Sequence, residues 1–300
     1  MRRLESRVAI VTGAGRGIGR AHALALAAGG ASVVVNDLGG DREGNGVSET
    51  PAHDVVREIG QAGGRAIVSN HDVADWRQAE ELVGLATRSF GGLHVLVNNA
   101  GILRDRTLAN LEEGEWDAVI RVHLKGHAAM ARHCMAYWRL QSKAGKPPSA
   151  SMIHTTSIAG FAGNFGQAAY AAAKAGIIGL SLVAALEGRS YGVRSNAVSP
   201  SARTRLDPSM KAAAEGAFDT FDPGNVSPLV AWLAEAGCPA TGQVFQAYGN
   251  RIKVISPATI AEDLRTDGRW DVATIDRELR GRLLDARPLS YYVEEIGALG

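Results

Sequence analysis

The sequence has few cysteines, no excess of charge and no long uninterrupted apolar run. Cys134 and Cys238 are its two cysteines, too few for a disulfide framework or a cysteine metal site, which favours a reducing compartment. The net charge of +1 lacks the electrostatic signature of a nucleic-acid or anionic-membrane partner. No apolar run approaches the roughly 18 residues of a membrane span, and the first residues lack a signal-peptide core. We therefore expect a cytoplasmic protein with neither nucleic acid nor membrane as its partner.

Glycine, by contrast, is abundant. The chain has 36 glycines and 10 prolines, with 21% charged residues, whereas the usual glycine share is roughly 7%. This composition excludes collagen and a disordered chain. A length of 300 residues predicts one large α/β domain, alone or with an appendage.

Short apolar runs rich in valine and isoleucine alternate with amphipathic stretches of helical length. Seven runs are expected as strands: 8–12, 31–36, 65–70, 94–98, 151–155, 193–199 and 243–247. Helical patterns lie near 17–29, 51–62, 75–90, 112–140, 167–188 and 225–235. Most of the strands are apolar on both faces, as in a parallel sheet covered by helices on each side. The alternation predicts right-handed βαβ units in a doubly wound, Rossmann-type parallel sheet of seven strands.

The chain divides into this sheet domain and a C-terminal extension. We expect the domain to cover residues 1–250, and residues 251–300 to pack on it or on a neighbouring subunit, because so short and charged a segment offers little core of its own. Weak helical patterns in the extension lie near 258–265 and 273–285. Two long connections interrupt the domain, a glycine-rich polar insertion at 38–50 and a segment at 200–224, and connections of that length are usually functional or mobile.

A glycine-rich turn follows the first strand and opens the first helix. Its residues are Gly13, Gly15, Arg16, Gly17, Ile18 and Gly19. Free backbone N–H groups and the helix dipole make such a turn an anion site, and the absent side chains let a pyrophosphate approach. The spacing is GxxxGxG rather than the more widespread GxGxxG. A tight turn without a ligand is the alternative interpretation.

Asp37 ends the second strand about twenty residues after these glycines. There its carboxylate can accept hydrogen bonds from both hydroxyls of an adenine ribose and would repel a 2′-phosphate. Arg16 weakly favours NADP, since a basic side chain could pair with that phosphate. We give Asp37 more weight because a residue at a strand end is held rigidly, so the predicted cofactor is NAD. The competing interpretation is that Asp37 only forms the following turn.

Tyr170 and Lys174 lie four residues apart in an alanine-rich stretch, and this spacing puts both on one face of a helix. A phenol has a pKa of about 10 and is a poor base at neutral pH. A nearby ammonium, with the positive ring of an oxidised nicotinamide, would lower that pKa. Ser157, just past the fifth strand, can face the same cleft and hold a substrate oxygen.

Five motifs in order resemble the short-chain dehydrogenase/reductase family over about residues 5–250: the turn at 13–19, residues 98–101, Ser157, the Tyr170/Lys174 pair and Ser199-Pro200. The resemblance implies that Tyr170 is the catalytic acid/base, that Ser157 binds the substrate oxygen, and that Lys174 binds the nicotinamide ribose. It also implies cofactor contacts from Asp72, Val73, Asn99, Ala100, Gly101, Tyr170, Lys174, Pro200, Ser201 and Thr204.

Two positions depart from the family pattern. His123 stands where most members have an asparagine that supports a proton-relay water, and we include it among the catalytic residues. Ser201 replaces the usual glycine after the proline.

One subgroup is more similar to this chain than the rest of the family. Segments 35–41, 101–105, 122–124 and 163–167 resemble the (3R)-hydroxyacyl-CoA dehydrogenase domain of type 2 peroxisomal multifunctional β-oxidation enzymes. These relatives use NAD, in agreement with Asp37. No hydratase domain follows and the last residues are not the peroxisomal Ser-Lys-Leu signal, so the expectation is a stand-alone cytoplasmic enzyme.

The expected activity is hydride transfer between NAD(H) and a secondary alcohol or its ketone. The resemblance favours a 3-hydroxyacyl thioester, which could carry a steroid. A 3-oxoacyl carrier-protein reductase is the alternative enzyme, and a catalytically silent nucleotide-binding protein is the alternative of another class.

No metal is expected, although His123 and His127 share one helical face, because no third ligand can be named. In this family the helices at 112–140 and 167–188 usually form the oligomer interface, so a homodimer or homotetramer is expected.

Overall fold

The computed structural model describes residues 3–205, 210, 212–214, 216–256, 263–265 and 268–279. Its centre is an eight-stranded sheet of order β3-β2-β1-β4-β5-β6-β7-β8. The strands are β1 (Val8–Thr12), β2 (Ser32–Asn36), β3 (Arg65–Ser69), β4 (Val95–Asn98), β5 (Ala150–Thr155), β6 (Val193–Pro200), β7 (Val244–Tyr248) and β8 (Arg251–Ile255). The first seven pair in parallel, which confirms the predicted doubly wound sheet.

The eighth strand was not predicted, and seven was therefore the wrong strand count. β8 pairs antiparallel with β7, with Tyr248 opposite Arg251. The two residues between the strands are Gly249, at φ +52°, and Asn250. Glycine and asparagine are the residues that two-residue hairpin turns favour. The residues after 250 thus begin by extending the sheet, as an edge strand.

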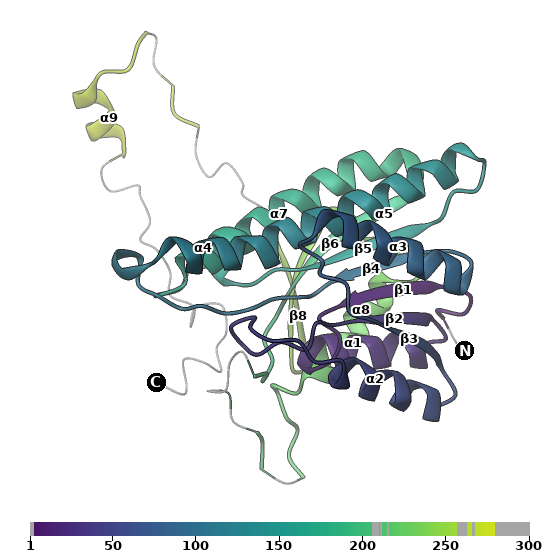
Figure 1. Cartoon of the computed structure of the whole chain (residues 1–300). Coiled ribbons are helices and arrows are strands. Elements are labelled where there is room, and N and C mark those ends of the chain that lie inside the picture. Colours follow the sequence, from purple (N-terminus) through teal and green to yellow (C-terminus); the bar gives the residue numbers. More distant parts are fainter. Residues whose placement is uncertain are drawn as a thin grey trace.

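Helices cover both faces of the sheet (Figure 1). On one face α1, α2 and α8 pack over β-strand residues such as Val11 and Val35; on the other, α3 and α5 pack over residues such as Ile10 and Val34. Their bounds are α1 (Gly17–Ala28), α2 (Thr50–Gln61), α3 (Trp76–Phe90), α4 (Glu113–Ile120), α5 (Gly126–Lys143), α6 (Ala159–Ala162), α7 (Ala168–Gly188) and α8 (Ser227–Leu233). Because strand order reverses between β1 and β4, a crevice opens at the carboxyl ends of the strands.

The helix predicted at 112–140 is interrupted. A π-helical turn at Arg121–Lys125 separates α4 from α5. Such a turn inserts one extra residue into the helical repeat, re-aims the side chains that follow it, and is frequent at functional sites. Here it carries His123.

α7 and the turn after it, Ala168–Tyr191, are long and apolar enough to cross a membrane, with a mean hydropathy of 1.7 over the best 18-residue window, of which 39% is buried. Lys174 interrupts this stretch, so the sequence contains no uninterrupted apolar run of this length here. The helix packs against β5 and β6 and contributes to the main cavity.

In the extension, α9 (Val272–Leu279) overlaps the pattern predicted at 273–285 and has no buried residue. It stands apart from the sheet in Figure 1. The weak pattern at 258–265 falls largely outside the described residues. Packing of the extension on a neighbouring subunit stays a prediction.

Candidate active site

A cavity of about 720 Å³ lies at the carboxyl edge of the central strands. All the predicted site residues line it except Gly15. It is bordered by the glycine turn on one side and by β5, α7 and the π-helical turn on the other. A cleft at this edge of a doubly wound sheet is the usual place for a ligand.

The glycine turn leaves no room for side chains. A Cβ on Gly13 would lie 2.8 Å from Cα of Ala100, and a Cβ on Gly19 would lie 2.1 Å from the carbonyl oxygen of Gly13. Gly17 has φ +52° and faces Thr204. Among the described residues no side chain caps the N-terminus of α1. The turn therefore fits a dinucleotide pyrophosphate, since bare N–H groups and close backbone approach are what that group requires.

Gly15 does not line the cavity but binds the Asp37 side chain. Its N–H donates to Oδ2 of Asp37 at 2.7 Å, and the N–H of Gly39 donates to Oδ1 at 2.6 Å. A Cβ on Gly15 would lie 2.9 Å from that same Oδ2. Two backbone donors thus hold the carboxylate at the end of β2, next to the glycine turn.

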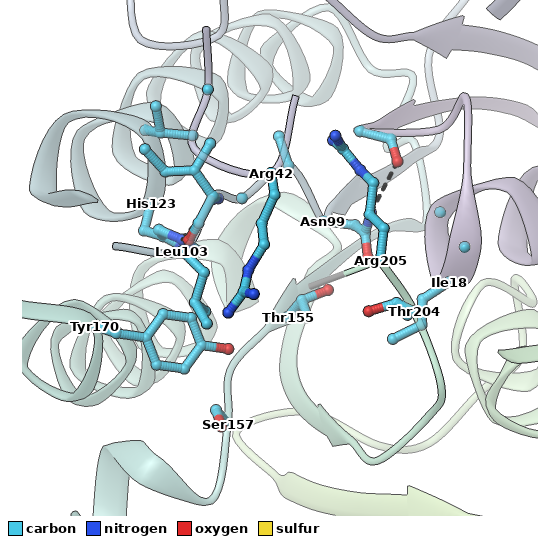
Figure 2. Close-up of a pocket in the computed structure, with 18 of the residues that line it drawn as sticks. Ile18, Arg42, Asn99, Leu103, His123, Thr155, Ser157, Tyr170, Thr204 and Arg205 are labelled. Carbon is cyan, nitrogen blue, oxygen red and sulfur yellow. Dashed lines mark hydrogen bonds between the residues drawn. The ribbon is translucent and has the colours of Figure 1, made fainter. Parts of the chain in front are cut away.

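The catalytic candidates come from α7 and the end of β5. Lys174 is buried, donates to the Thr155 carbonyl at 2.7 Å, and its Nζ lies 5.5 Å from the Tyr170 ring centroid. Figure 2 shows the hydroxyls of Tyr170 and Ser157 on the same side of the cavity. The N–H of Ala159 donates to Oγ of Ser157 at 3.2 Å, which orients that hydroxyl. The structure therefore brings together the three residues that the sequence placed 13 and 4 positions apart.

Burial changes the titration of Lys174. Desolvation lowers the pKa of its amine from 10.5 to about 7. The lysine can therefore exist in both protonation states at neutral pH, and the charge it carries depends on what else fills the cavity.

His123 is almost completely buried and contacts the wall of the cavity. Its Nε2 lies 2.8 Å from the carbonyl oxygen and 3.1 Å from the amide nitrogen of Ile102. Its ring meets the Tyr170 ring edge-on, with centroids 5.2 Å apart. Burial, and then the charge of Lys174, lower the pKa of His123 to about 3, so the ring is neutral. Gly101 is required beside it, because a Cβ there would lie 2.4 Å from Cε1 of His123.

Two more buried histidines, which sequence reasoning had not assigned to the site, lie behind His123. His127 stacks on His154 with ring centroids 5.8 Å apart, and His154 lies opposite Asn98 in the β4–β5 register. Among the described residues, Nδ1 of His123 and Nε2 of both His127 and His154 have no hydrogen-bond partner. Burial and the Lys174 charge lower the pKa of His154 to about 4. The spacing of His123 and His127 indicated that they share a helical face, but nothing in the sequence placed His154 beside them.

The remaining predicted cofactor residues line the cavity, and several are also tied to the framework. Asn99 donates to the carbonyls of Thr12 and Gly13, both at 3.1 Å, so its side chain joins β1 to β4. Asp72 pairs with Arg121. Arg16, Ile18, Val73, Ala100, Pro200, Ser201 and Thr204 are the others that line the cavity.

Sequence reasoning missed several lining residues in the insertion and in nearby loops. Among them are Arg42, Asp105, Gln167 and Arg205. Arg205 donates to the Gly40 carbonyl at 2.7 Å, and Figure 2 shows Arg42 reaching into the middle of the cavity. The length of the insertion could have pointed to Arg42, and the subgroup resemblance of segments 101–105 and 163–167 could have pointed to Asp105 and Gln167.

Known proteins share both the sequence and the fold. Residues 7–213 match the model of the family described as short chain dehydrogenase. The hydroxyacyl-CoA dehydrogenase ChsB1 of Mycobacterium tuberculosis is 43% identical over 92% of this chain and 88% of its own length. The peroxisomal multifunctional enzyme type 2 of Mus musculus is 41% identical over 81% of this chain and 32% of its own length. The crystal structure of a short chain dehydrogenase from Mycobacterium avium superposes with a TM-score of 0.85 at 50% identity, covering 95% of this chain and 98% of that one.

Proposed function

This chain belongs to the short-chain dehydrogenase family, and on that premise we propose that it is an NAD(H)-dependent oxidoreductase that interconverts a secondary alcohol and a ketone. The observation that carries the proposal is one cavity with a bare glycine turn and Asp37 on one wall, and Tyr170, Ser157 and Lys174 on the other. The first wall suits a dinucleotide and the second suits acid–base chemistry at an oxygen.

In the oxidation direction Tyr170 removes the alcohol proton, and in the reduction direction it returns a proton to the ketone oxygen. Ser157 donates a hydrogen bond to that oxygen and holds it near Tyr170. A positive charge on Lys174, close to the phenol ring, favours the phenolate form of Tyr170. A nicotinamide bound beside Tyr170 and Lys174 would supply the hydride chemistry at the carbinol carbon.

NAD is proposed over NADP because of Asp37 at the end of β2. Two backbone N–H groups donate to its side-chain oxygens and hold it in place. A 2′-phosphate there would meet its negative charge, whereas two ribose hydroxyls would donate to it. Arg16 and Arg205 lie nearby, but both donate to the Gly40 carbonyl, at 3.3 and 2.7 Å. These contacts support the assignment that Asp37, not Arg16, selects the cofactor.

The proposed substrate is a 3-hydroxyacyl-CoA thioester, including one whose acyl chain carries a steroid. The support is the relative named hydroxyacyl-CoA dehydrogenase, which matches 92% of this chain. The 3-oxoacyl carrier-protein reductase reaction is the second candidate, and the assay below separates the two.

Steady-state kinetics test both assignments. The purified chain should be assayed with NAD and NADP against both C3 epimers of 3-hydroxyacyl-CoA, a steroid-bearing acyl-CoA, simple alcohols and, for reduction, a 3-oxoacyl carrier protein. We expect kcat/KM with NAD to exceed that with NADP by roughly tenfold or more, and Asp37→Asn to narrow the ratio. Equal use of NADP would overturn the cofactor assignment. A preference for the carrier-protein thioester would favour the reductase.

We also propose that the active form is a homo-oligomer joined through α5 and α7. Leu140 on α5 and Val183 and Leu186 on α7 are exposed, Leu186 at 74%. Large exposed apolar side chains on one pair of helices support a protein interface. Light scattering of the purified chain should give a mass of two or four copies, and a monomer at micromolar concentration would contradict it.

A further inference from the structure

Three segments that include part of the sequence resemblance to one subgroup of the family meet at one side of the cavity. They are the insertion after β2, the loop at 101–106 and the loop at 163–167, which leads into α7. We call residues 38–48 of the insertion the strap. None of these segments supplies Tyr170, Ser157 or Lys174, so the mechanism leaves their convergence without a role.

The strap is ordered by its own contacts although most of it is exposed. The N–H of Ser48 donates to the Leu38 carbonyl at 2.9 Å, and the N–H of Asp41 donates to the Asn45 carbonyl at 2.8 Å. Gly39 has φ +71°, and a Cβ there would lie 1.8 Å from the Ser48 carbonyl oxygen. The strap therefore keeps a defined path.

Near its start the strap touches the nucleotide side of the cavity. The Gly40 carbonyl accepts from Arg16 of the glycine turn and from Arg205. The middle of the strap packs on the 101–106 loop: the N–H of Leu103 donates to the Arg42 carbonyl at 3.1 Å, and Gly44 lies so close to Ile102 that a Cβ would be 2.9 Å from its Cγ2. The strap thus contacts both the glycine turn and the 101–106 loop.

Asp105 then joins the strap to the loop that precedes Tyr170. Its Oδ2 accepts from Arg42 at 3.4 Å and its Oδ1 accepts from Nε2 of Gln167 at 3.1 Å. Oε1 of Gln167 in turn accepts from Asn164 at 2.9 Å. Backbone contacts reinforce the junction, since the N–H of Arg106 donates to the Gly166 carbonyl at 2.8 Å.

We propose that Asp105 is a positioning residue that couples dinucleotide binding to the 163–167 loop beside the substrate. A dinucleotide on the glycine turn restrains the strap and Arg42, Arg42 restrains Asp105, and Asp105 restrains Gln167 three residues before Tyr170. Coupling of two binding events is reciprocal, so substrate binding also strengthens dinucleotide binding. The inference rests on the proposed function, because it requires a dinucleotide at the glycine turn.

Hydrogen exchange on the full chain tests the coupling without a substrate. Peptides covering 13–19 and 163–167 should be followed with no addition, with NADH and with NADPH. We expect NADH to increase protection in both peptides of the wild type. In Asp105→Ala, the NADH-dependent increase in protection should remain at 13–19 and disappear at 163–167. Asp105→Asn keeps an oxygen for Gln167 but not the charge for Arg42, so part of the increase at 163–167 should remain.

Kinetics provide the second measurement. Asp105→Ala should raise the substrate KM by about two- to fivefold, the range of an exposed charge pair, while kcat and the NADH dissociation constant stay within about twofold of the wild-type values. Arg77→Ala is the matched control, because it removes another exposed ion pair, with Glu81 at 2.8 Å on α3, and should change neither measurement.

The outcomes separate the two proposals. An unchanged gain at 163–167 in Asp105→Ala would overturn the coupling and leave the proposed function standing. Absence of any dinucleotide protection at 13–19 in the wild type would overturn the proposed function and the coupling together. Lower protection across the whole Asp105→Ala chain, with a lowered Tm, would show that Asp105 acts on folding, which also contradicts the coupling.

Discussion

The two walls of the cavity are built in opposite ways. The catalytic wall is carried by α7 and the end of β5, and it rests on buried polar side chains: Lys174 and, behind it, His154 are 2% and 0% exposed. The nucleotide wall consists of glycines and a polar strap, held by bonds between backbone groups and by Asp37. Proton chemistry gains from a dry, charged interior that shifts pKa values, whereas a phosphate group needs bare backbone.

The comparison also predicts where changes act. Substitutions on the catalytic wall should alter rate and pH dependence, because its groups titrate in a low-dielectric site. Substitutions in the strap of the nucleotide wall should alter binding by smaller factors, because its side-chain contacts are exposed and individually weak.

The largest effect should come from Tyr170→Phe, which removes the acid/base oxygen and leaves the ring in place. We expect kcat to fall by about 10²- to 10⁴-fold, with the NADH dissociation constant nearly unchanged. Turnover and fluorescence titration measure the two quantities. Undiminished turnover would show that Tyr170 is not the proton-transferring group.

Lys174→Met should change the pH dependence of stability by a few kcal/mol. The folded wild type releases the Lys174 proton near pH 7, whereas the unfolded chain keeps it to about 10.5, so the unfolded state binds more protons between these values. The free energy of unfolding of the wild type should therefore rise from pH 7 to pH 10 relative to that of Lys174→Met. Denaturant unfolding without ligand measures this. A constant difference between the two proteins would show that Lys174 is not desolvated.

The buried histidines should make the protein acid-sensitive. With the pKa of His154 lowered from 6.5 to about 4, the unfolded chain binds a proton that the folded protein does not. Stability is therefore lost as pH falls from 6.5 to 4, with a slope of about 1.4 kcal/mol per pH unit for each such group. His154→Met should make the slope of the free energy of unfolding against pH shallower. The control His53→Gln replaces an exposed ring and should leave the slope unchanged. An equal change of slope in both variants would show that burial of His154 does not cause the acid sensitivity.

The smallest effect should come from the strap, where two glycines form a matched pair. Gly44 and Gly46 have φ +89° and +77°, but only Gly44 faces a neighbour, Ile102; a Cβ on Gly46 has nothing within 4 Å. Both alanine variants have the same backbone strain, so any difference between them comes from the contact of residue 44 with Ile102. We expect Gly44→Ala to weaken NADH binding by about three- to fivefold and Gly46→Ala to weaken it by less. Titration calorimetry measures the difference. Identical affinities would show that the strap does not depend on its contact with Ile102.

Most of the fold and the catalytic residues followed from local patterns. Apolar runs and helical periodicity predicted seven strands and the helices around them, with bounds close to those observed. The GxxxGxG turn and the Tyr170/Lys174 spacing pointed to their chemistry because each lies within one turn or one helical face. Such signals act over a few residues, so they can be read along the chain.

Tertiary structure decided the rest. β8 became part of the sheet through a hairpin whose glycine and asparagine lie outside any apolar run. The π-helical turn re-aimed His123 toward Ile102, and the sheet register brought His154 to Asn98. Asp105 reached Arg42 and Gln167 across 63 and 62 residues. Contacts over such separations depend on how whole elements pack, and the burial that lowers the pKa of Lys174 arises only once they have packed.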